Sequence, residues 1–252
     1  MRSLLFVPAH KEKLIQKAFR SEADAIILDL EDSCPGEKNK SIGIRNIKIY
    51  GKTTQKIVIA RISNDKEISL FNNIVDYIMY PKAEGILPLG SVKFILLVET
   101  ALGVLKLPEI ITDPRVVGVA FGNEDYKADT GCELYWYAEH TIMNCAKAYG
   151  KFAIDTVHTD FNDLKSLELK CLLSKDVGFD GKLCIHPKEI PIINECYIPT
   201  NKEYEYSKEM IELYDKAVSS GDGVAVIDGI YVAPPMVKNA KRIIEKYGKY
   251  IS

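Results

Sequence analysis

The sequence predicts an α/β protein whose main part is a (β/α)8 barrel. Short apolar runs recur along the chain, and each is followed by a polar residue or a proline. Apolar runs without alternation are typical of strands that are buried on both faces of a parallel sheet. Eight such runs, separated by helix-compatible stretches, match the eight strand–helix units of a closed barrel. The predicted strands are Ser3–Val7, Ala25–Leu28, Lys56–Ala60, Tyr77–Tyr80, Lys93–Val98, Val116–Phe121, Phe152–Ile154 and Lys182–Ile185.

The stretches between the runs predict the helices that cover the barrel. Lys11–Arg20 places apolar residues such as Leu14 and Phe19 on one face. Tyr137–Tyr149 and Asp163–Lys175 carry comparable apolar stripes. Eight units in about 190 residues make a compact barrel, so some of its helices must be short.

The pattern changes beyond Pro187 and predicts a C-terminal helical extension. Its expected elements are the helix Glu203–Ser219, the extended segment Val224–Ile227, a turn at Asp228-Gly229 and the helix Met236–Tyr247. We therefore expect a barrel over residues 1–190, followed by an extension over 191–252. The extension is expected to pack on the barrel or on a neighbouring subunit.

Composition excludes several classes of protein. The 33 basic and 35 acidic residues leave a net charge of −2, whereas binders of nucleic acid or anionic membranes carry a basic excess. The longest apolar stretches fall far below the roughly 18 residues of a membrane span. The N-terminal segment predicts a strand rather than a signal peptide, and the six scattered cysteines form no C-x-x-C pair. We expect a reduced, cytoplasmic protein.

Polar residues gather where the predicted strands end, which is where barrel enzymes carry their chemistry. In chain order they are Asp29, Glu31 and Asp32, then Arg61, Pro81-Lys82, Glu99-Thr100, Asn123 to Asp125, Asp155-Thr156 and His186-Pro187. Competing motifs are missing from the sequence: no G-x-G-x-x-G follows a strand, and there is no G-x-S-x-G.

Glu99 and Asp125 predict a site for a divalent cation. Glu99 closes an apolar run and should point into the barrel mouth, where a carboxylate needs a cation or a proton. Asp125 ends the neighbouring strand, and two carboxylates on adjacent strand ends suit Mg²⁺, with Mn²⁺ as an alternative.

The other strand-end residues have two interpretations each. Arg61 offers a planar fork to a substrate carboxylate, or else pairs with Asp29 or Glu31. The three acids after the second strand either serve the site or cap a helix. Lys82 suits a Schiff base or a charged lysine that pairs with nearby carboxylates. His186, followed by a proline, favours a fixed structural or hydrogen-bonding role over that of a base.

Six segments in order resemble one known family. They are Arg2-Ser-Leu-Leu-Phe-Val-Pro8, Ile27-Leu-Asp-Leu-Glu-Asp32, Pro81-Lys82, Val98-Glu-Thr-Ala-Leu-Gly103, Phe121-Gly-Asn-Glu-Asp125 and Gly178-Phe-Asp-Gly-Lys-Leu-Cys-Ile-His-Pro187. Together they resemble the citrate lyase β-subunit-like family of the HpcH/HpaI aldolase superfamily, over nearly the whole chain. The resemblance implies a TIM barrel of the phosphoenolpyruvate/pyruvate type that forms trimers or multiples of trimers.

The resemblance also implies an activity and a set of roles. The family makes and breaks carbon–carbon bonds in β-hydroxy acyl thioesters, such as citryl, malyl and citramalyl groups on coenzyme A or an acyl carrier. In family terms Glu99 and Asp125 match the Mg²⁺ ligands, and Arg61 matches the residue that grips the oxo-acid product. Asp29, Glu31 and Asp32 match an acidic catalytic motif around the metal-bound water. Glu99 and Lys82 are also expected to contact the substrate.

Two positions depart from the family pattern. The family's C-terminal stretch carries an Asp that reaches a neighbour's active site as an acid or base, and here that position is Ala233. A general acid or base contributes about 10²–10⁴ in rate, so its loss bears directly on turnover. Glu189 stands where the family commonly has Gln.

Three functions follow from these observations. The first is a Mg²⁺-dependent carbon–carbon lyase that acts on a short acyl thioester or the corresponding free hydroxy acid. The second is an accessory protein that binds the oxo acid or acyl-coenzyme A without turnover, as the loss at Ala233 suggests. The third is an aldolase that releases pyruvate from a 4-hydroxy-2-oxo acid.

Overall fold

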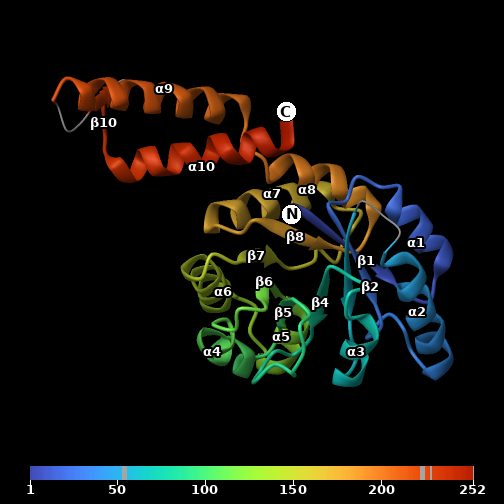
Figure 1. Ribbon diagram of the computed structural model, residues 1–252. Coiled ribbons are helices and arrows are strands. Elements are labelled where there is room, and N and C mark those ends of the chain that lie inside the picture. Colours follow the sequence, from blue (N-terminus) through green and yellow to red (C-terminus); the bar gives the residue numbers. More distant parts are fainter. Residues whose placement is uncertain (53–55, 222–224, 228, 252) are drawn as a thin grey trace. The chain divides into compact units, whose positions relative to one another are not determined.

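Eight parallel strands form a closed barrel in the computed structural model, which describes residues 1–52, 56–221, 225–227 and 229–251 (Figure 1). Neighbouring strands pair in chain order, and β1 pairs with β8 to close the ring. The strands are β1 Ser3–Pro8, β2 Ala25–Asp29, β3 Ile57–Arg61, β4 Tyr77–Tyr80, β5 Phe94–Val98, β6 Val116–Phe121, β7 Phe152–Asp155 and β8 Gly181–Cys184. All eight predicted strands, and with them the predicted fold class, are confirmed.

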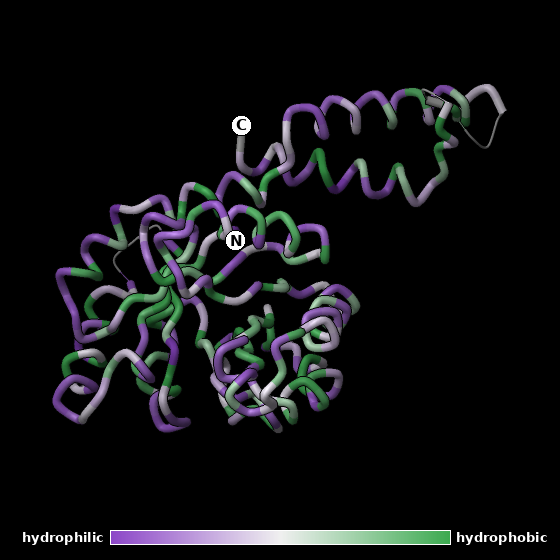
Figure 2. The backbone as a smooth tube through the Cα atoms, turned by 180° about the vertical axis from the view of Figure 1, so that it is seen from behind, coloured by the Kyte–Doolittle hydropathy of each residue, from purple (hydrophilic) through white to green (hydrophobic). Residues whose placement is uncertain are grey.

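The strands bury both faces, which explains their unbroken apolar sequences. One apolar cluster draws residues from all eight strands and fills the barrel interior; Leu4, Ile27, Ile59 and Leu97 belong to it. The intervening strand residues join a larger cluster with the helices. Figure 2 shows hydrophobic strands at the centre and helices whose hydropathy alternates along their length. The period of two therefore assigns every strand residue either to the interior or to the helix layer.

Helices of unequal length surround the barrel. They are α1 Glu12–Phe19, α2 Glu37–Tyr50, α3 Ile68–Phe71, α4 Ala101–Ile110, α5 Asn123–Thr130, α6 Trp136–Ala148, α7 Leu164–Val177 and α8 Ile190–Cys196, with 3₁₀ turns η1 Asp65–Glu67 and η2 Pro187–Glu189. The prediction that some would be short is confirmed by α3, which has four residues. The connection between β4 and β5, which the structure describes throughout, contains no helix. Across the described ranges, no helix is long and apolar enough to cross a membrane.

The chain divides into two compact units, Met1–Tyr197 and Ile198–Ser252. The first unit runs past the predicted boundary at residue 190 because α8 packs on α7, β1 and β8. The second unit contains α9 Asn201–Ser219, β9 Ala225–Ile227, β10 Ile230–Val232 and α10 Pro234–Ile251. Of the predicted extension, Val224 and Asp228 lie outside the described residues.

The second unit has a small apolar core of its own. Residues from α9, both strands and α10 form it: Met210, Ala225, Val232, Val237 and Ala240. A capping box begins α9, in which the Thr200 hydroxyl accepts from the Glu203 N–H and the Glu203 carboxylate accepts from the Thr200 N–H. That the extension packs on the barrel or on another subunit stays a prediction.

A buried ion pair lies between the barrel and its helices. The Lys182 ammonium is 2.6 Å from Asp155 Oδ2, and the two side chains are 1% and 6% exposed. Their chain neighbours Ile154 and Leu183 belong to the interior cluster, so alternation turns Asp155 and Lys182 to the opposite face. The sequence did not predict this pair, because Lys182 stood at the start of an apolar run.

Lys182→Met is expected to lower the free energy of unfolding by about 3–5 kcal/mol, because it leaves the Asp155 carboxylate buried without a counter-charge. The double variant Asp155→Leu/Lys182→Met should recover most of that loss, since neither charge then remains. Urea unfolding followed by circular dichroism measures both. A single variant as stable as the double variant would contradict this prediction.

Candidate active site at the carboxyl ends of the strands

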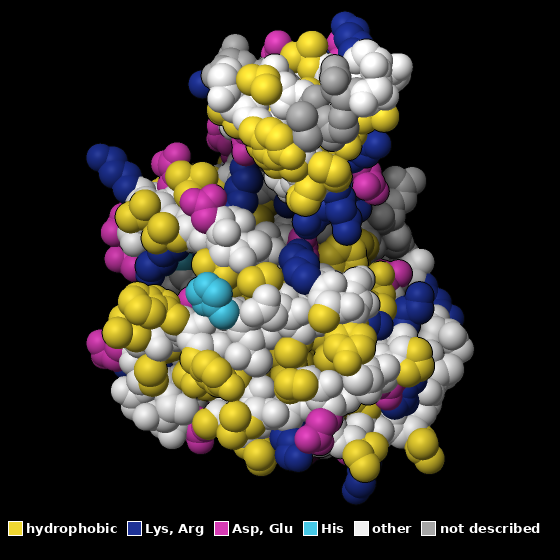
Figure 3. Space-filling view, turned by 90° about the vertical axis from the view of Figure 1, so that its left-hand side faces the viewer, with side chains coloured by type: hydrophobic (Ala, Val, Ile, Leu, Met, Phe, Trp, Pro, Cys, Tyr) yellow, Lys and Arg dark blue, Asp and Glu magenta, His cyan; other side chains and the backbone are white. Residues whose placement is uncertain are grey.

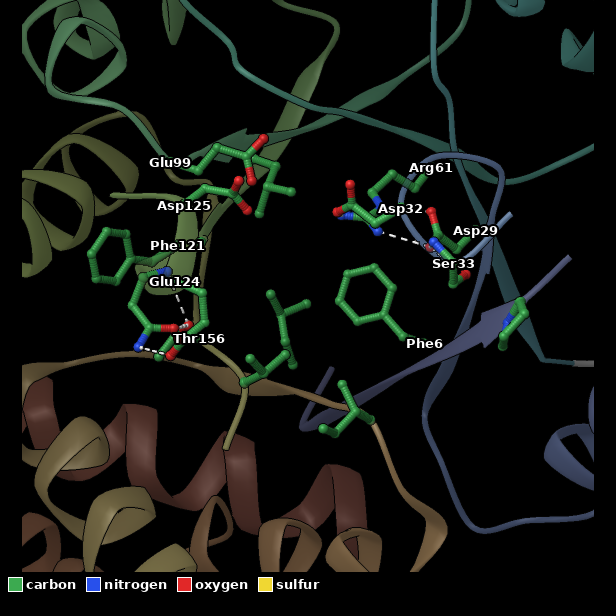
Figure 4. A pocket seen from close by; sticks show the side chains of 17 residues that line it. Phe6, Asp29, Asp32, Ser33, Arg61, Glu99, Phe121, Glu124, Asp125 and Thr156 are labelled. Atoms are coloured by element: carbon green, nitrogen blue, oxygen red, sulfur yellow. Dashed lines mark hydrogen bonds and ion pairs between the residues drawn. The ribbon is translucent and has the colours of Figure 1, made fainter. Parts of the chain in front are cut away.

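A cavity of about 320 Å³ opens where the strands end. Its walls continue the alternation of the barrel interior: Asp29 follows Ile27 by two residues, and Arg61 follows Ile59 by two. The lining consists of Phe6, Pro8, Asp29, Asp32, Ser33, Arg61, Leu97, Glu99, Phe121, Gly122, Asn123, Glu124, Asp125, Thr156, Val157, Leu183 and Ile185 (Figure 4). The strand-end residues that the sequence singled out therefore do converge, with the exceptions given below.

Arg61 is held by a bidentate ion pair with Asp29. Asp29 and Arg61 are register partners at the ends of β2 and β3, so their side chains leave the barrel side by side. Arg61 Nε donates to Asp29 Oδ1 at 2.6 Å, and Nη2 donates to Oδ2 at 2.8 Å. The guanidinium also lies over the Phe6 ring, 4.9 Å from its centroid. One edge of the guanidinium is thus fixed by the protein itself.

The other edge of Arg61 faces two more carboxylates. Its Nη1 lies 3.0 Å from Glu31 Oε2 and 3.2 Å from Asp32 Oδ2. The ion pairs considered in the sequence analysis are therefore present, and Asp32 joins them. Glu31 and Asp32 are the groups that a substrate carboxylate would have to replace in order to reach Nη1.

Asp29 organises the loop that follows β2. Its carboxylate accepts hydrogen bonds from the backbone N–H groups of Glu31 and Ser33 and from the Ser33 hydroxyl. Burial alone would raise the pKa of Asp29, but the hydrogen bonds and charge of Arg61 hold it below 3.8. Burial raises the pKa of Glu31, and the charges of Asp32 and Asp29 add to that rise.

Glu99 is a buried carboxylate without a cationic contact in the described part of the chain. It is 2% exposed, and its Oε1 accepts from the Lys82 backbone N–H at 2.9 Å. Burial raises the pKa of Glu99 to about 8, with further contributions from the charges of Asp125 and Glu31. Figure 4 shows the Glu99 and Asp125 carboxylates side by side at one end of the cavity. A cation bound beside the pair would favour the ionised form of Glu99.

Gly122 permits this arrangement. Gly122 directly follows β6 and is the N-cap residue of α5, whose first turn carries Asp125. A Cβ at this position would lie 2.7 Å from the Glu99 Cβ and 2.8 Å from its Oε2. Only glycine therefore leaves the Glu99 carboxylate where it stands, beside Asp125.

The donor set fits a magnesium ion. Mg²⁺ takes oxygen ligands and is usually bound by one or two carboxylates, with water and substrate oxygens in the other positions. Glu99 and Asp125 supply two such carboxylates. Among the described residues no cluster of three or more His, Cys, Asp or Glu side chains forms a metal site. Glu99 and Asp125 are the residues that would hold the ion, with water and substrate oxygens in the other positions.

Several residues that the sequence singled out do not line the cavity, among them Glu31, Lys82, Thr100, Asp155 and His186. Lys82 is exposed and does not line the cavity; it reaches Glu99 through its backbone N–H, in a left-handed conformation with φ +46°. His186 caps η2, accepting from the Lys188 N–H at 3.1 Å, and stacks on Phe161. The structural interpretation of His186 fits these contacts.

Phe6 was not singled out by the sequence, whereas Asn123 and Thr156 were noted at strand ends without an assigned role. Phe6 forms a wall of the cavity and contacts Arg61. The Asn123 backbone N–H donates to Thr156 Oγ1 at 3.2 Å, and the Thr156 hydroxyl donates to Asn123 Oδ1, which ties the ends of β6 and β7 together. The positions of Asn123 and Thr156 at strand ends were the only available signal.

The fold and the site define the class. The sequence model of the HpcH/HpaI aldolase/citrate lyase family matches residues 2–41 and 35–187. The chain belongs to this family, and the resemblance drawn from its motifs is confirmed.

The chain is similar to several curated proteins and solved structures along most of its length. A (3S)-malyl-CoA thioesterase of Cereibacter sphaeroides is 30% identical, over 97% of this chain and 94% of its own length. A citrate lyase subunit beta of Leuconostoc mesenteroides is 29% identical, over 97% and 92%. The structure of Mycobacterium tuberculosis CitE with magnesium, acetoacetate and coenzyme A has a TM-score of 0.83 at 27% identity and covers 98% of each chain. A citrate lyase beta subunit from M. tuberculosis with oxaloacetate and magnesium has a TM-score of 0.71 at 29% identity, over 78% of this chain and 96% of its own.

Asp29→Asn is expected to lower the free energy of unfolding by about 2–3 kcal/mol, because Arg61 loses its bidentate partner and the loop loses its acceptor. Asp32→Asn is the matched control: its side chain is 69% exposed, so the loss should stay below about 0.5 kcal/mol. Urea unfolding at neutral pH compares the two, and equal losses would contradict the assignment.

The stability difference between wild type and Asp29→Asn is expected to depend on pH. The pKa of Asp29 is lowered in the folded chain, so its contribution is complete above its unfolded value of 3.8 and disappears as the pH falls through the folded value. The stability difference between wild type and Asp29→Asn should therefore stay constant at neutral pH and shrink below about pH 4. Unfolding measured across that range provides the test, and a difference that grows in acid would contradict it.

Proposed function

We propose that this protein is a Mg²⁺-dependent carbon–carbon lyase that acts on a β-hydroxy acyl thioester. The observation that carries the proposal is the buried Glu99, which has no cationic contact among the described residues and lies beside Asp125, across one cavity from Arg61. Relatives named as citrate lyase subunit beta, and a structural neighbour that holds magnesium and coenzyme A, support the same assignment.

Each residue has a role in this reaction. Glu99 and Asp125 hold Mg²⁺, which supplies a Lewis acid for the hydroxyl and carboxylate oxygens of the substrate. Arg61 contributes positive charge next to the oxo-acid half, and Asp29 keeps its guanidinium in one orientation. The closed barrel beneath the cavity keeps bulk water away from the buried side of the site.

The bond changes are those of a retro-Claisen cleavage. The hydroxyl loses its proton, its carbon becomes a carbonyl, and the adjacent carbon–carbon bond breaks. The electron pair of that bond passes to the acetyl thioester, which leaves as an enolate and takes up a proton at carbon. The products are an oxo acid and an acetyl thioester.

The proton for the enolate distinguishes the alternative functions. The family's usual acid at this step is Asp, and Ala233 cannot donate a proton. This substitution favours, as a second candidate, an accessory protein that binds the oxo acid or acyl-coenzyme A without turnover. The name of the malyl-CoA thioesterase relative raises a further outcome, hydrolysis of the thioester with the carbon skeleton intact.

A product assay separates these outcomes. Purified protein with Mg²⁺ is offered malyl-, citramalyl- and citryl-coenzyme A, and the products are identified by mass spectrometry. Metal-dependent release of acetyl-coenzyme A is the expected result. Free coenzyme A with an intact hydroxy acid would indicate a thioesterase, and binding without any product would indicate an accessory protein. Pyruvate and an aldehyde from a free 4-hydroxy-2-oxo acid would indicate an aldolase.

Glu99→Gln is expected to lower Mg²⁺ affinity and turnover at least about 100-fold, because a neutral amide replaces one of two anionic ligands. Gly122→Ala keeps both carboxylates but forces Glu99 to move, so it should weaken Mn²⁺ binding at least about tenfold by electron paramagnetic resonance. Gly85→Ala is the control, because open space surrounds that position. Unchanged metal binding in Glu99→Gln would refute the assignment.

We also propose that the protein assembles into a homo-oligomer, with a trimer as the expected state. Hydrophobic side chains gather over the face that carries α4 and α6 (Figure 3). The exposed residues there are Leu102, Leu105, Leu134, Trp136 and Tyr137. Contiguous exposed apolar patches are uncommon on monomers and mark interaction surfaces, so a second copy of the chain is the proposed partner.

Trp136→Glu combined with Leu105→Glu should convert this assembly into monomers, because a charge would be buried without a partner at the contact. Leu14→Glu, which changes an exposed leucine on α1, is the control and should leave the mass unchanged. Light scattering after size-exclusion chromatography measures the mass. A wild-type monomer would contradict the assembly, and an unaffected double variant would place the contact elsewhere.

A further inference from the structure

Two cysteine side chains of neighbouring helices are in contact. Cys171 lies in the middle of α7, and Cys196 is the last residue of α8. The Cys171 thiol forms a side-chain hydrogen bond with the sulfur of Cys196. Both cysteines are free thiols, as are the other four in the chain. Neither residue lines the cavity at the strand ends, so the pair is separate from the candidate active site.

The packing of α7 on α8 holds the two thiols together (Figure 1). Ser174, one turn after Cys171, accepts a hydrogen bond at 2.8 Å from the hydroxyl of Tyr197, the residue after Cys196. Cys171, Cys196 and Tyr197 belong to the same apolar cluster. The two helices therefore meet along residues 171–174 and 196–197. A disulfide requires such an approach, because its two Cβ atoms are about 3.5–4.5 Å apart.

The two thiols differ in exposure and in acidity. Cys171 is fully buried, whereas Cys196 is 8% exposed and ends a helix, where local opening breaks few contacts. The hydrogen bond from Cys171 lowers the pKa of Cys196, although burial opposes this shift. Of the charged neighbours, Lys175 adds to the lowering, and Glu168 and Glu195 oppose it. The same hydrogen bond, together with burial, raises the pKa of Cys171.

An acidic thiol beside a second, protonated thiol is the arrangement of a nucleophilic cysteine with a resolving cysteine. We propose that Cys196 and Cys171 form a reversible disulfide when the protein meets a small-molecule disulfide such as glutathione disulfide. This modification site requires neither Mg²⁺ nor a substrate, so it is independent of the proposed function.

The reaction is a thiol–disulfide exchange in two steps. The Cys196 thiolate attacks one sulfur of glutathione disulfide, whose S–S bond breaks and releases one glutathione thiolate. Cys171 then loses its proton and attacks Cys196 Sγ, which releases the second glutathione. The protons of both cysteines end on the two glutathione thiols. Two protein thiols are oxidised by two electrons in total, and one small disulfide is reduced.

The disulfide would fasten the helix layer where the barrel closes. α8 packs on β1 and β8, whose pairing completes the sheet, and Cys196 lies directly before the end of the first compact unit. A link to Cys171 closes a loop of about 25 residues and lowers the entropy of the unfolded chain. The oxidised protein is therefore expected to melt about 5–10 °C higher than the reduced protein.

Peptide mapping tests the link directly. The full chain is incubated with glutathione disulfide, remaining thiols are alkylated, and tryptic peptides are identified by mass spectrometry. Cys171 lies in the tryptic peptide 171–175 and Cys196 in the peptide 189–202. We expect these two peptides to be joined until dithiothreitol separates them, in a protein whose mass is lower by two hydrogen atoms. A lasting glutathione adduct on Cys196, a link between other cysteines or no reaction would overturn the proposal.

Single substitutions separate the roles of the two thiols. Cys171→Ser keeps the attacking thiol, so it should stop at a glutathione adduct on Cys196 and gain no thermal stability. Cys196→Ser should leave Cys171 reduced, and an adduct on Cys171 at the wild-type rate would overturn the assigned order of attack. Cys145→Ser, which changes a half-buried cysteine of α6, is the matched control and should form the link as wild type does. The mapping of the wild-type protein decides the proposal even if a variant does not fold.

Discussion

The parallel pairing of β1 with β8 is the constraint on which the site depends. It closes the sheet, and closure brings the carboxyl ends of all eight strands around one opening. Residues more than 90 positions apart in the chain, such as Arg61 and Thr156, then line the same cavity. The period of two decides which of them face it, since Asp29, Arg61 and Glu99 each follow an interior residue by two. The alternation of side chains that packs the barrel interior therefore also decides which polar side chains face the cavity.

The two ends of the cavity differ in whether their charged side chains have partners of opposite charge. At one end Arg61 and Asp29 satisfy each other, and hydrogen bonds from the following loop complete the carboxylate. At the other end Glu99 and Asp125 stand together, and burial with mutual repulsion raises the pKa of Glu99. The first arrangement is complete within the protein. The second leaves a buried carboxylate that needs a cation or a proton, and it is the end at which we propose that the metal binds.

The local sequence was sufficient to predict the strands and the polar residues that follow them. The apolar runs predicted all eight strands, and the residues that follow them include Asp29, Arg61, Glu99 and Asp125, which the structure brings to one cavity. Contacts between residues far apart in the sequence could not be predicted in this way. The ion pair of Lys182 with Asp155 requires the register of β7 with β8. The role of the Lys82 backbone N–H depends on a left-handed conformation that a lysine seldom adopts, and the side chain had suggested a different role.

The residues proposed to recognise the oxo acid and the position of the family's usual proton donor lie in different units of the chain. All the residues that carry the predicted recognition of the oxo acid belong to the barrel unit, whereas Ala233 belongs to the second unit. Alanine at residue 233 therefore leaves the lining residues of the barrel cavity unchanged, because residue 233 is not one of them. A lyase and an accessory binding protein built on this chain would share the same metal ligands, the same Arg61 and the same cavity. They would differ only in whether a proton reaches the enolate, so binding and turnover have to be measured as separate properties of the molecule.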